Sequence, residues 1–342
     1  MSATKTILVT GGAGFIGSHT SVELINNGFT PVVVDDYRNS DRRNIEGVNS
    51  ITNTEVIVRE IDICDLDKLK EVFQEFQFDG IIHFAAYKAV GESVEKPLDY
   101  YRNNIVGLVN CLQLAEEFYI RNIVFSSSCT VYGEPEGIKT VTEASPVQPA
   151  NSPYGNTKQI GEEIIRDLIL SGANMKIINL RYFNPVGAHK SSIIGELPIG
   201  TPNNLFPYVM QTGIGKLEEL SVFGNDYDTK DGTCIRDYIH VCDVAEAHVK
   251  ALDWLMAQEG RFSEDINIGT GKGTSVLEVI NMFEEVAQLK LNWKFAARRP
   301  GDVEEIYANV EKSISLLNWR ATRTVMDAVQ DAWNWEKKLN ND

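Results

Sequence analysis

Residues 10–17 read Thr-Gly-Gly-Ala-Gly-Phe-Ile-Gly, directly after the β-branched run Thr6–Thr10 and directly before a helical pattern. The glycines satisfy two related spacings, GxxGxxG (Gly11, Gly14, Gly17) and GxGxxG (Gly12, Gly14, Gly17). Glycine lets the chain turn tightly, lets backbone amides approach a pyrophosphate, and lets the following helix lie close to the strand. The stretch therefore predicts a strand, turn and helix that bind a dinucleotide. A glycine turn with a purely structural role is the alternative.

An acidic residue at the end of the next β-branched run favours NAD over NADP. Asp35 follows the last glycine at about the expected distance of twenty residues, where a carboxylate accepts from ribose hydroxyls and repels a 2′-phosphate. Arg38, Arg42 and Arg43 come after the aspartate and could form a phosphate clamp. We favour a solvated surface for these arginines. NAD is therefore the predicted cofactor.

Short apolar runs alternate with helical periodicity through the first half of the chain. The runs are Thr6–Thr10, Pro31–Asp35, Glu55–Glu60, Gly80–Phe84, Asn122–Ser126 and Lys176–Arg181. Near-continuous apolar runs are typical of buried parallel strands, and parallel strands need helical crossovers. Apolar stripes within residues 66–76, with Asp65 as N-cap, and within residues 105–115 supply two such helices. The pattern predicts an α/β fold with a doubly wound parallel sheet, the Rossmann architecture.

The pattern changes after about Arg181, where prolines and glycines predict long loops of the kind that often carry substrate. A further strand at Asp237–Val241 and a helix at Val244–Leu255 are expected to return to the first sheet. We predict a NAD-binding domain at residues 1–185, rejoined by part of residues 235–260. Residues 186–342 are expected to form a smaller mixed α/β domain that mainly binds substrate.

Charge and cysteine usage restrict the partners and the compartment. The 342 residues carry 32 basic and 48 acidic side chains, a formal charge of −16, which repels nucleic acid and anionic lipid. The cysteines form an odd, scattered set, and no apolar stretch of about 18 residues is present. We expect a cytoplasmic protein with no nucleic-acid or membrane partner. The histidines show no metal-binding spacing, so no metal is assigned.

A tyrosine and a lysine four positions apart predict proton-transfer chemistry. Tyr154 and Lys158 lie in Ser-Pro-Tyr-Gly-Asn-Thr-Lys, residues 152–158, and on a helix they share one face. A free tyrosine titrates near about 10, but an adjacent cation favours its phenolate. Ser128 ends a run of hydroxyls at a predicted strand end, where it could bind a substrate oxygen. We predict Tyr154, Lys158 and Ser128 as catalytic residues, with a surface pair as the ordinary alternative.

Neighbouring residues in the same hydroxyl run are expected to be structural. Three adjacent serines, Ser126–Ser128, are redundant for binding one oxygen. Cys129 could be a nucleophile, but no cysteine–histidine motif accompanies it, so packing is the favoured role.

Together these motifs resemble the extended short-chain dehydrogenase/reductase family. Residues 83–93 (HFAAYKAVGES), 181–189 (RYFNPVGAH) and 236–241 (RDYIHV) resemble the UDP-glucose 4-epimerases of that family, and the similarity runs from Ile7 to about Trp335. The resemblance implies reversible inversion of UDP-glucose and UDP-galactose at carbon 4, through a transient 4-ketosugar and hydride transfer to and from NAD. It also implies a homodimer formed by pairs of helices, for which Ile160, Ile164 and Leu168 offer an apolar face.

The resemblance further implies two sets of binding residues. NAD would be held by Gly11, Gly14, Phe15, Ile16, Gly17, Asp35, Asp62, Ile63, Phe84, Lys88, Asn103, Tyr154, Lys158 and Phe183. The UDP-sugar would be surrounded by Ser128, Asn184, Asn204, Leu205, Phe223, Arg236, Arg299 and Asp302, with the arginines facing the pyrophosphate. Each residue has a structural alternative, such as capping a turn or filling the core.

Substrate range and reaction type leave alternatives open. Ile306 stands where relatives limited to unacetylated sugars often have tyrosine, so N-acetylhexosamine forms stay an alternative. Another NAD-dependent enzyme acting on nucleotide sugars is a second alternative. Dehydratases of the family usually place acidic residues after the active Ser/Thr, whereas this chain has Cys129 and Thr130. A cofactor-sensing binding module is a third, which the intact catalytic residues argue against.

Overall fold

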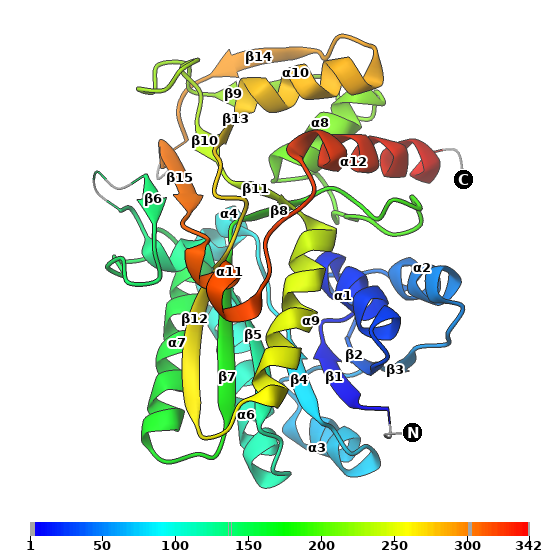
Figure 1. The fold of residues 1–342 in the computed structure, drawn as a ribbon. Coiled ribbons are helices and arrows are strands. Elements are labelled where there is room, and N and C mark those ends of the chain that lie inside the picture. Colours follow the sequence, from blue (N-terminus) through cyan, green and yellow to red (C-terminus); the bar gives the residue numbers. More distant parts are fainter. Residues whose placement is uncertain (1–3, 136, 138, 300–302, 341–342) are drawn as a thin grey trace.

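The protein is described by a computed structural model for residues 4–135, 137, 139–299 and 303–340. Its main feature is a seven-stranded sheet in which every neighbouring pair is parallel, in the order β12-β7-β5-β4-β1-β2-β3 (Figure 1). The strands are β1 (Thr6–Thr10), β2 (Thr30–Val34), β3 (Ile57–Arg59), β4 (Gly80–His83), β5 (Asn122–Ser128), β7 (Lys176–Tyr182) and β12 (Phe262–Ile268). The predicted doubly wound α/β fold is confirmed.

Helices cover both faces of this sheet because its strands are apolar on both sides. In β1, Ile7 and Val9 point to one core cluster and Leu8 to the other, and all three are fully buried. The first face carries α1 (Phe15–Asn26), α2 (Arg42–Thr52), α9 (Val241–Ala257) and α11 (Glu311–Leu317). The second face carries α3 (Leu66–Glu75), α6 (Gly107–Glu117) and α7 (Pro153–Leu170), with α4 (Val90–Glu95), α5 (Pro97–Tyr101) and a π-helical turn η1 (Arg102–Val106) beside them.

The local signals in the sequence explain where α3 begins and which side it buries. The Asp65 side chain accepts a hydrogen bond from the Lys68 backbone N–H at 3.2 Å, as the N-cap prediction requires. Leu69, Val72 and Phe73 are the buried residues of the predicted stripe. The apolar periodicity therefore placed this helix correctly.

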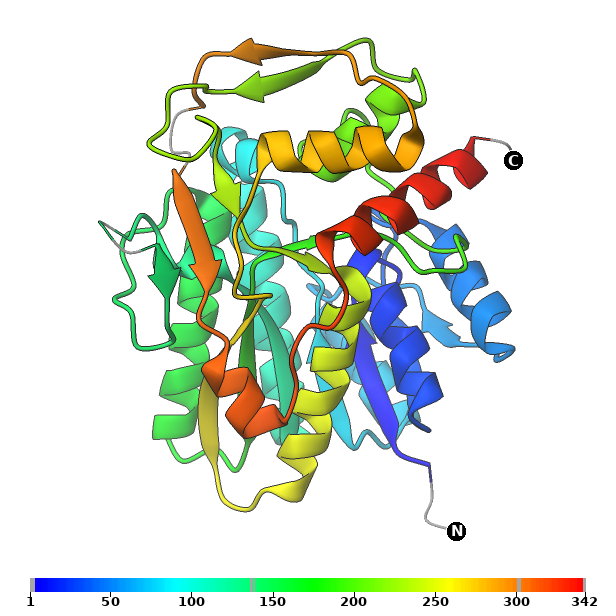
Figure 2. The same ribbon diagram turned by 45° about the horizontal axis from the view of Figure 1, so that its top comes forward.

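A smaller unit stands beyond the carboxyl ends of the strands and has a core of its own (Figure 2). It contains α8 (Leu205–Gly213), α10 (Val276–Ala287) and α12 (Val325–Leu339), with the parallel pair β9 (Leu220–Phe223) and β14 (Trp293–Ala296). Phe283 and Trp333 meet edge to face in this core at 5.2 Å between ring centroids.

Short strands connect the two units. A four-stranded sheet runs in the order β13 (Thr274–Ser275), β10 (Ile235–Arg236), β15 (Glu305–Ala308) and β6 (Thr140–Val141). A two-stranded sheet pairs β8 (Asn184–Val186) with β11 (Tyr238–His240), and a short 3-10 turn η2 (Cys129–Tyr132) follows β5.

The expected return of the strand at 237–241 to the first sheet is wrong. This segment is β11, which pairs with β8 outside the main sheet. The strand that joins the sheet is β12, which lies beyond α9 and pairs with β7. Its first half, Phe-Ser-Glu-Asp, is polar because β12 is an edge strand and this half is only partly buried. It therefore lacked the apolar run that marks a central strand.

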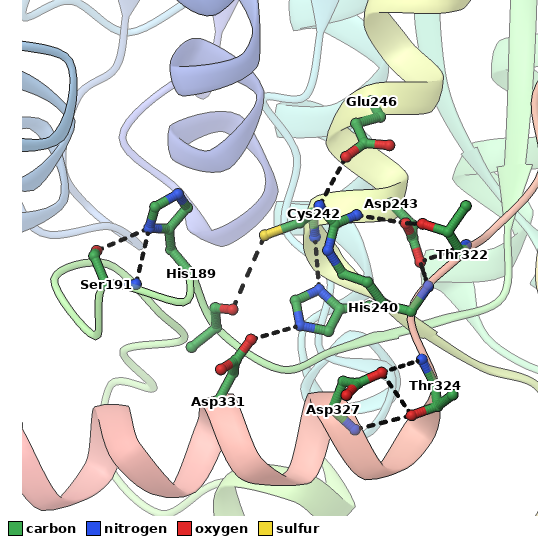
Figure 3. Close-up of polar contacts among 12 residues, drawn as sticks. His189, Ser191, His240, Cys242, Asp243, Glu246, Thr322, Thr324, Asp327 and Asp331 are labelled. Carbon is green, nitrogen blue, oxygen red and sulfur yellow. Dashed lines mark hydrogen bonds and ion pairs between the residues drawn. The ribbon is translucent and has the colours of Figure 1, made fainter.

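Polar contacts fasten the start of α12 to α9 (Figure 3). Asp243 in the first turn of α9 accepts from the backbone N–H of Arg323 at 3.0 Å and from its guanidinium at 2.5 Å. His240 caps α9 by accepting from the Cys242 N–H at 3.1 Å, which leaves Nε2 to donate to Asp331 of α12 at 3.3 Å. The smaller unit is thereby fixed to α9 and to β11, the strand that follows Arg236 in the chain.

Candidate active site

A cavity of about 900 Å³ lies where the parallel strands end, between the sheet and the smaller unit. This is the edge at which open α/β sheets bind ligands. Its wall includes predicted cofactor residues Gly11, Gly14, Phe15, Ile16, Gly17, Asp35, Ile63, Phe84, Lys88, Asn103, Tyr154, Lys158 and Phe183. It also includes predicted substrate residues Ser128, Asn184, Asn204, Leu205, Phe223, Arg236 and Arg299. Asp62 stands off this wall, and Asp302 falls outside the described residues.

The glycine turn forms a cradle that side chains would fill. Gly11 has a φ of +70°, and a Cβ there would stand 2.7 Å from the Ala85 backbone nitrogen. A Cβ at Gly17 would stand 2.4 Å from the Gly11 carbonyl oxygen. Gly14 caps α1 without a side-chain hydrogen bond, so no capping side chain competes for the N–H groups of the first turn. These features fit the pyrophosphate of NAD.

Asp35 ties the turn to the end of β2. One carboxylate oxygen accepts from the Ala13 N–H at 2.9 Å, and the other accepts from the Ser40 hydroxyl at 2.7 Å. Burial raises the pKa of Asp35, while these hydrogen bonds oppose the rise. Asn39 and Ser40 also line the cavity, and sequence reasoning missed both. Both residues follow shortly after Asp35 at the end of β2, and this position was the signal that could have identified them as cavity residues.

The arginines after β2 face acidic side chains. Arg38 pairs with Asp36 and, at 2.6 Å, with Asp62. Arg42 pairs with Glu60. Because each guanidinium already has a carboxylate partner, the arrangement favours the surface role over a clamp for a 2′-phosphate. The pairing with Arg38 also accounts for the position of Asp62.

The N-terminus of α7 positions Tyr154 at the cavity. The Ser152 hydroxyl accepts from the Gly155 N–H at 3.1 Å, so the helix begins at Pro153. Lys158 lies one turn further, with its ammonium 6.0 Å from the centre of the Tyr154 ring. Its Nζ donates to the Ser126 carbonyl at 2.5 Å. The structure thus brings the predicted Tyr154, Lys158 and Ser128 together on one wall.

Burial dominates the electrostatics of the pair. Burial raises the pKa of Tyr154 to about 12, and a hydrogen bond with Ser128 opposes that rise. Burial also lowers the pKa of Lys158 to about 7. The expected lowering of the Tyr154 pKa by Lys158 therefore stays a prediction, and burial of the phenolate opposes it. Because burial disfavours the ammonium form of Lys158, neighbouring groups must stabilise that form if Lys158 is to stay charged near pH 7.

Asn104 joins the cofactor side of the cavity to α7, and the sequence did not reveal it. Its side chain donates to the Thr157 hydroxyl at 3.0 Å and accepts from the Tyr87 N–H at 2.8 Å. Its carbonyl oxygen also accepts from the Asn103 amide at 3.0 Å. Asn104 lies in the π-helical turn η1, a feature frequent at functional sites. It holds Asn103 on the cavity wall.

The opposite wall carries positive groups suited to a diphosphate. The Arg299 guanidinium lies 3.9 Å from the centre of the Phe223 ring, so the two side chains stack. Arg236 extends from β10 onto the same wall, and its guanidinium donates to the Ile235 carbonyl at 2.9 Å. Asn204 and Leu205 form the N-terminus of α8, whose dipole adds to the positive field.

Glu196 connects the two sides of the cavity, and it was also missed. Its carboxylate accepts from the Lys88 ammonium at 2.9 Å and from the Asn204 amide at 3.3 Å. The Trp335 indole donates to the Glu196 carbonyl at 3.1 Å, which anchors this segment to α12. The sequence places Glu196 among loop residues with no motif, so only the fold identifies it.

Several other functional readings find no support in the described part of the chain. Burial raises the pKa of the Cys129 thiol to about 12, far from that of a nucleophilic thiolate. Among the described residues no group of His, Cys, Asp or Glu is arranged to hold a metal. No helix within the described ranges has both the length and the apolarity to cross a bilayer.

Comparison with known proteins gives consistent matches over nearly the full length. A family model described as GDP-mannose 4,6 dehydratase matches residues 8–332. The chain is 49% identical over 335 residues to UDP-glucose 4-epimerase 2 of Arabidopsis thaliana, covering 97% of this chain and 95% of the relative. It is 48% identical to UDP-glucose 4-epimerase of Bacillus subtilis, with 98% of each covered.

A solved structure matches equally well. The UDP-glucose 4-epimerase of Bifidobacterium longum, crystallised with NAD⁺ and UDP, superposes with a TM-score of 0.94 at 43% identity. The match covers 98% of this chain and 99% of that protein.

Proposed function

This chain belongs to the UDP-glucose 4-epimerases of the extended short-chain dehydrogenase/reductase family, and we propose that its own Tyr154, Lys158 and Ser128 carry out the reaction. The enzyme is an isomerase that interconverts UDP-glucose and UDP-galactose at carbon 4 through a transient 4-ketosugar. The observation that carries the residue assignment is their meeting on one cavity wall beside the glycine turn.

NAD is the cofactor, and when bound it accepts a hydride from the sugar and returns it. Carbon 4 of a hexose is not acidic, so its configuration is inverted through a planar ketone. We assign the glycine turn, Asp35, Lys88 and Asn103 to hold NAD, on the strength of the cradle described above. Tyr154 removes the proton of the 4-hydroxyl, and Ser128 positions that oxygen. Lys158 supplies the positive charge beside the phenolate.

The UDP portion is held by the wall opposite Tyr154. Arg236, Arg299 and the N-terminus of α8 bind the diphosphate, and Asn184 and Phe223 line the same space. Firm binding of this portion leaves the sugar free to turn and present its other face. The remaining substrate residue, Asp302, is proposed on resemblance alone.

A coupled assay tests the assignment directly. UDP-galactose is supplied, and formation of UDP-glucose is followed through a UDP-glucose dehydrogenase. Wild-type protein is expected to form UDP-glucose without added reductant, because the hydride returns to the sugar. Failure of purified, NAD-containing protein to form UDP-glucose would refute the function.

Elimination to a deoxysugar is the second reaction class within this family. The family model bears the name of a dehydratase, but the full-length relatives are named epimerases. Cys129 and Thr130 occupy the places of the acid and base that elimination needs, and Cys129 is a protonated thiol. We therefore propose epimerisation without elimination. Mass spectrometry of the product would detect the loss of water that contradicts this.

We propose that N-acetylhexosamine forms are accepted as well. Ile306 is buried beside Phe183 and Tyr132, on the strand next to Arg236. Ile306 does not line the cavity itself, but Phe183 beside it does. A tyrosine at position 306 would be bulkier by most of an aromatic ring, so isoleucine leaves more room behind Phe183. Comparing turnover of UDP-galactose with that of UDP-N-acetylgalactosamine tests this.

We also propose a homodimer that forms through the helices beside α7. Ile164 and Leu168 pack against the core, so they are not the exposed apolar surface. Val94 and Leu98, on α4 and α5, are 62% and 80% exposed and lie on helices that contact α7. Leu98→Glu should give a monomer in analytical ultracentrifugation, whereas Ile199→Glu, at an apolar site elsewhere that is 66% exposed, should not.

Two broader assignments remain proposals. The cytoplasm is the proposed compartment, supported by cysteines that are all free in the described structure. Fractionation of cells would test it. The NAD-binding domain is proposed as residues 1–185 with part of 235–260, and the substrate domain as most of 186–342. The main sheet also includes β12, so the last strand of this sheet along the chain ends at Ile268, beyond the proposed range.

A further inference from the structure

Three consecutive serines at the end of β5 each contact a different residue of α7. The Ser126 carbonyl accepts from Lys158 at 2.5 Å, and the Ser127 hydroxyl donates to Glu162 at 2.5 Å. Ser128 hydrogen-bonds with Tyr154. The three residues on the helix are one turn apart on a single face: Tyr154, Lys158 and Glu162. The side chains of Ser127 and Ser128 therefore have separate partners on α7, and the residue that the mechanism has not used is Glu162.

Glu162 is buried and held in a fixed orientation. Its side chain is 3% exposed, and both carboxylate oxygens accept from the guanidinium of Arg181, at 2.9 and 2.6 Å. Arg181 is itself 2% exposed and also pairs with Asp265 at 2.7 Å. Two-point pairing of this kind fixes geometry as well as charge. Because Arg181 holds the Glu162 carboxylate in place, its negative charge stays on the same face of α7 as Lys158, where it favours the ammonium form.

Among the described groups around Lys158, Glu162 is the one whose negative charge favours the ammonium form of the lysine. On α7 the neighbours are Tyr154 and Glu162, and β5 contributes the Ser126 carbonyl. On β4, burial and the lysine charge lower the pKa of His83 to about 3, so this histidine is neutral near pH 7.

The remaining groups belong to β7 and β12. On β7, burial raises the pKa of Tyr182, so it is neutral as well, and Arg181 is matched by carboxylates. On β12, Asp265 acts on the arginine. Two cations, Lys158 and Arg181, are therefore matched by two carboxylates, the buried Glu162 and the partly exposed Asp265.

We propose that Glu162 is a positioning residue that keeps Lys158 in its ammonium form and, through Ser127, holds β5 in register with α7. The proposal rests on the proposed function, because Lys158 matters through the phenolate of Tyr154. Without this carboxylate, the two cations would face only Asp265, which is partly exposed. Lys158 would then lose its proton more readily, and the phenolate would lose its stabilising charge.

The test variant is Glu162→Gln, which keeps the shape and the hydrogen-bonding oxygen but removes the charge. An opposite charge a few ångströms away typically moves a pKa by about 1–3 units. We expect the acid limb of the pH–rate profile to move to higher pH by about one unit and kcat near pH 7 to fall about tenfold. KM for UDP-galactose should stay within about twofold, because Glu162 does not line the substrate wall.

A second measurement follows the phenolate without turnover. Tyrosinate formation is titrated by ultraviolet difference spectroscopy in the presence of NAD, and the Tyr154→Phe variant supplies the background of the other tyrosines. The tyrosinate transition of Glu162→Gln should move in the same direction as its acid limb. If wild-type protein forms no UDP-glucose, the proposed function fails, whereas this titration still reports on Glu162.

Two further variants separate charge from shape. Ser127→Ala removes the hydrogen bond to β5 but leaves the carboxylate, so its acid limb should stay at the wild-type pH. Glu162→Asp keeps the charge on a shorter side chain and should also keep the limb, even if kcat falls. An unmoved limb and tyrosinate transition in Glu162→Gln would overturn the proposal. A shift of the acid limb in Ser127→Ala as large as that in Glu162→Gln would overturn the proposal too. If Glu162→Gln does not fold, Glu162→Asp is decisive, because a shifted acid limb in that charge-conserving variant would overturn the proposal.

Discussion

Replacing Gly17 by alanine should damage both stability and cofactor retention. Gly17 lies in the first turn of α1, and the helix crosses the glycine turn there with no room for a side chain. An ideal Cβ would stand 2.4 Å from the Gly11 carbonyl oxygen and 2.7 Å from the Gly12 Cα. All of these neighbours are backbone atoms, so no flexible side chain can move aside.

The size of the effect follows from these distances. Ordinary contact begins at about 3.4 Å, so α1 must withdraw by about 1 Å to accept the methyl group. Overpacking of a well-packed core costs typically about 1–3 kcal/mol. The same withdrawal moves the N–H groups of the first turn away from the pyrophosphate. Retained NAD should therefore fall together with stability.

Two glycines provide matched controls. At Gly14 the nearest atom to a Cβ is 3.2 Å away, so an alanine there should cost only a few tenths of a kcal/mol. At Gly91, in α4, no atom lies within 4 Å of a Cβ, and alanine should raise stability by up to about 1 kcal/mol through helix propensity.

Urea unfolding of the three alanine variants, with and without added NAD, measures the free energies. The absorbance of the purified proteins measures retained cofactor. Gly17→Ala should unfold at lower urea and lose NAD, Gly14→Ala should lie close to wild type in stability, and Gly91→Ala should equal or exceed it. A Gly17→Ala protein as stable as wild type and with full NAD would refute the argument from packing.

Three further predictions follow from the site and its buried groups. Tyr154→Phe should lower kcat in the coupled assay by about 10²–10⁴-fold or more while NAD absorbance and unfolding stay near wild type; near-normal turnover would remove Tyr154 from the mechanism. Ile306→Tyr should reduce turnover of UDP-N-acetylgalactosamine far more than that of UDP-galactose, and equal losses would argue against a steric role. Burial lowers the pKa values of His19, His83 and His248 to about 3, 3 and 4, so unfolded chains bind more protons below the usual histidine pKa. Stability should be full above about pH 6.5 and decline as pH falls toward 4; a urea midpoint that does not change between pH 7 and 5 would contradict this.

Local patterns predicted most of the large unit. The strands β1, β2, β3, β4, β5 and β7 fall within a few residues of their predicted ranges, because each is an apolar run bounded by turn residues. The same holds for α3, whose cap and stripe are both local features. By contrast, β12 escaped prediction because an edge strand does not need an apolar face on both sides.

The predicted site residues come mainly from motifs that the resemblance identified. Of those that the structure describes, only Asp62 lies off the cavity wall. The residues that were missed, such as Asn104 and Glu196, reach the site from loops and turns with no motif. Their importance comes from partners distant in the sequence.

The sequence by itself determined the parallel sheet, the dinucleotide turn, and the placement of Tyr154 and Lys158 on one helical face, because each depends on spacing along a few consecutive residues. Only the tertiary structure decided how deeply that pair is buried and which groups surround it. Desolvation raises the pKa of Tyr154 to about 12, and the carboxylate of Glu162 is locked by Arg181 on another strand. Burial and long-range charge pairing depend on which segments the fold brings into contact. These contacts cannot be inferred from the spacing of a few consecutive residues.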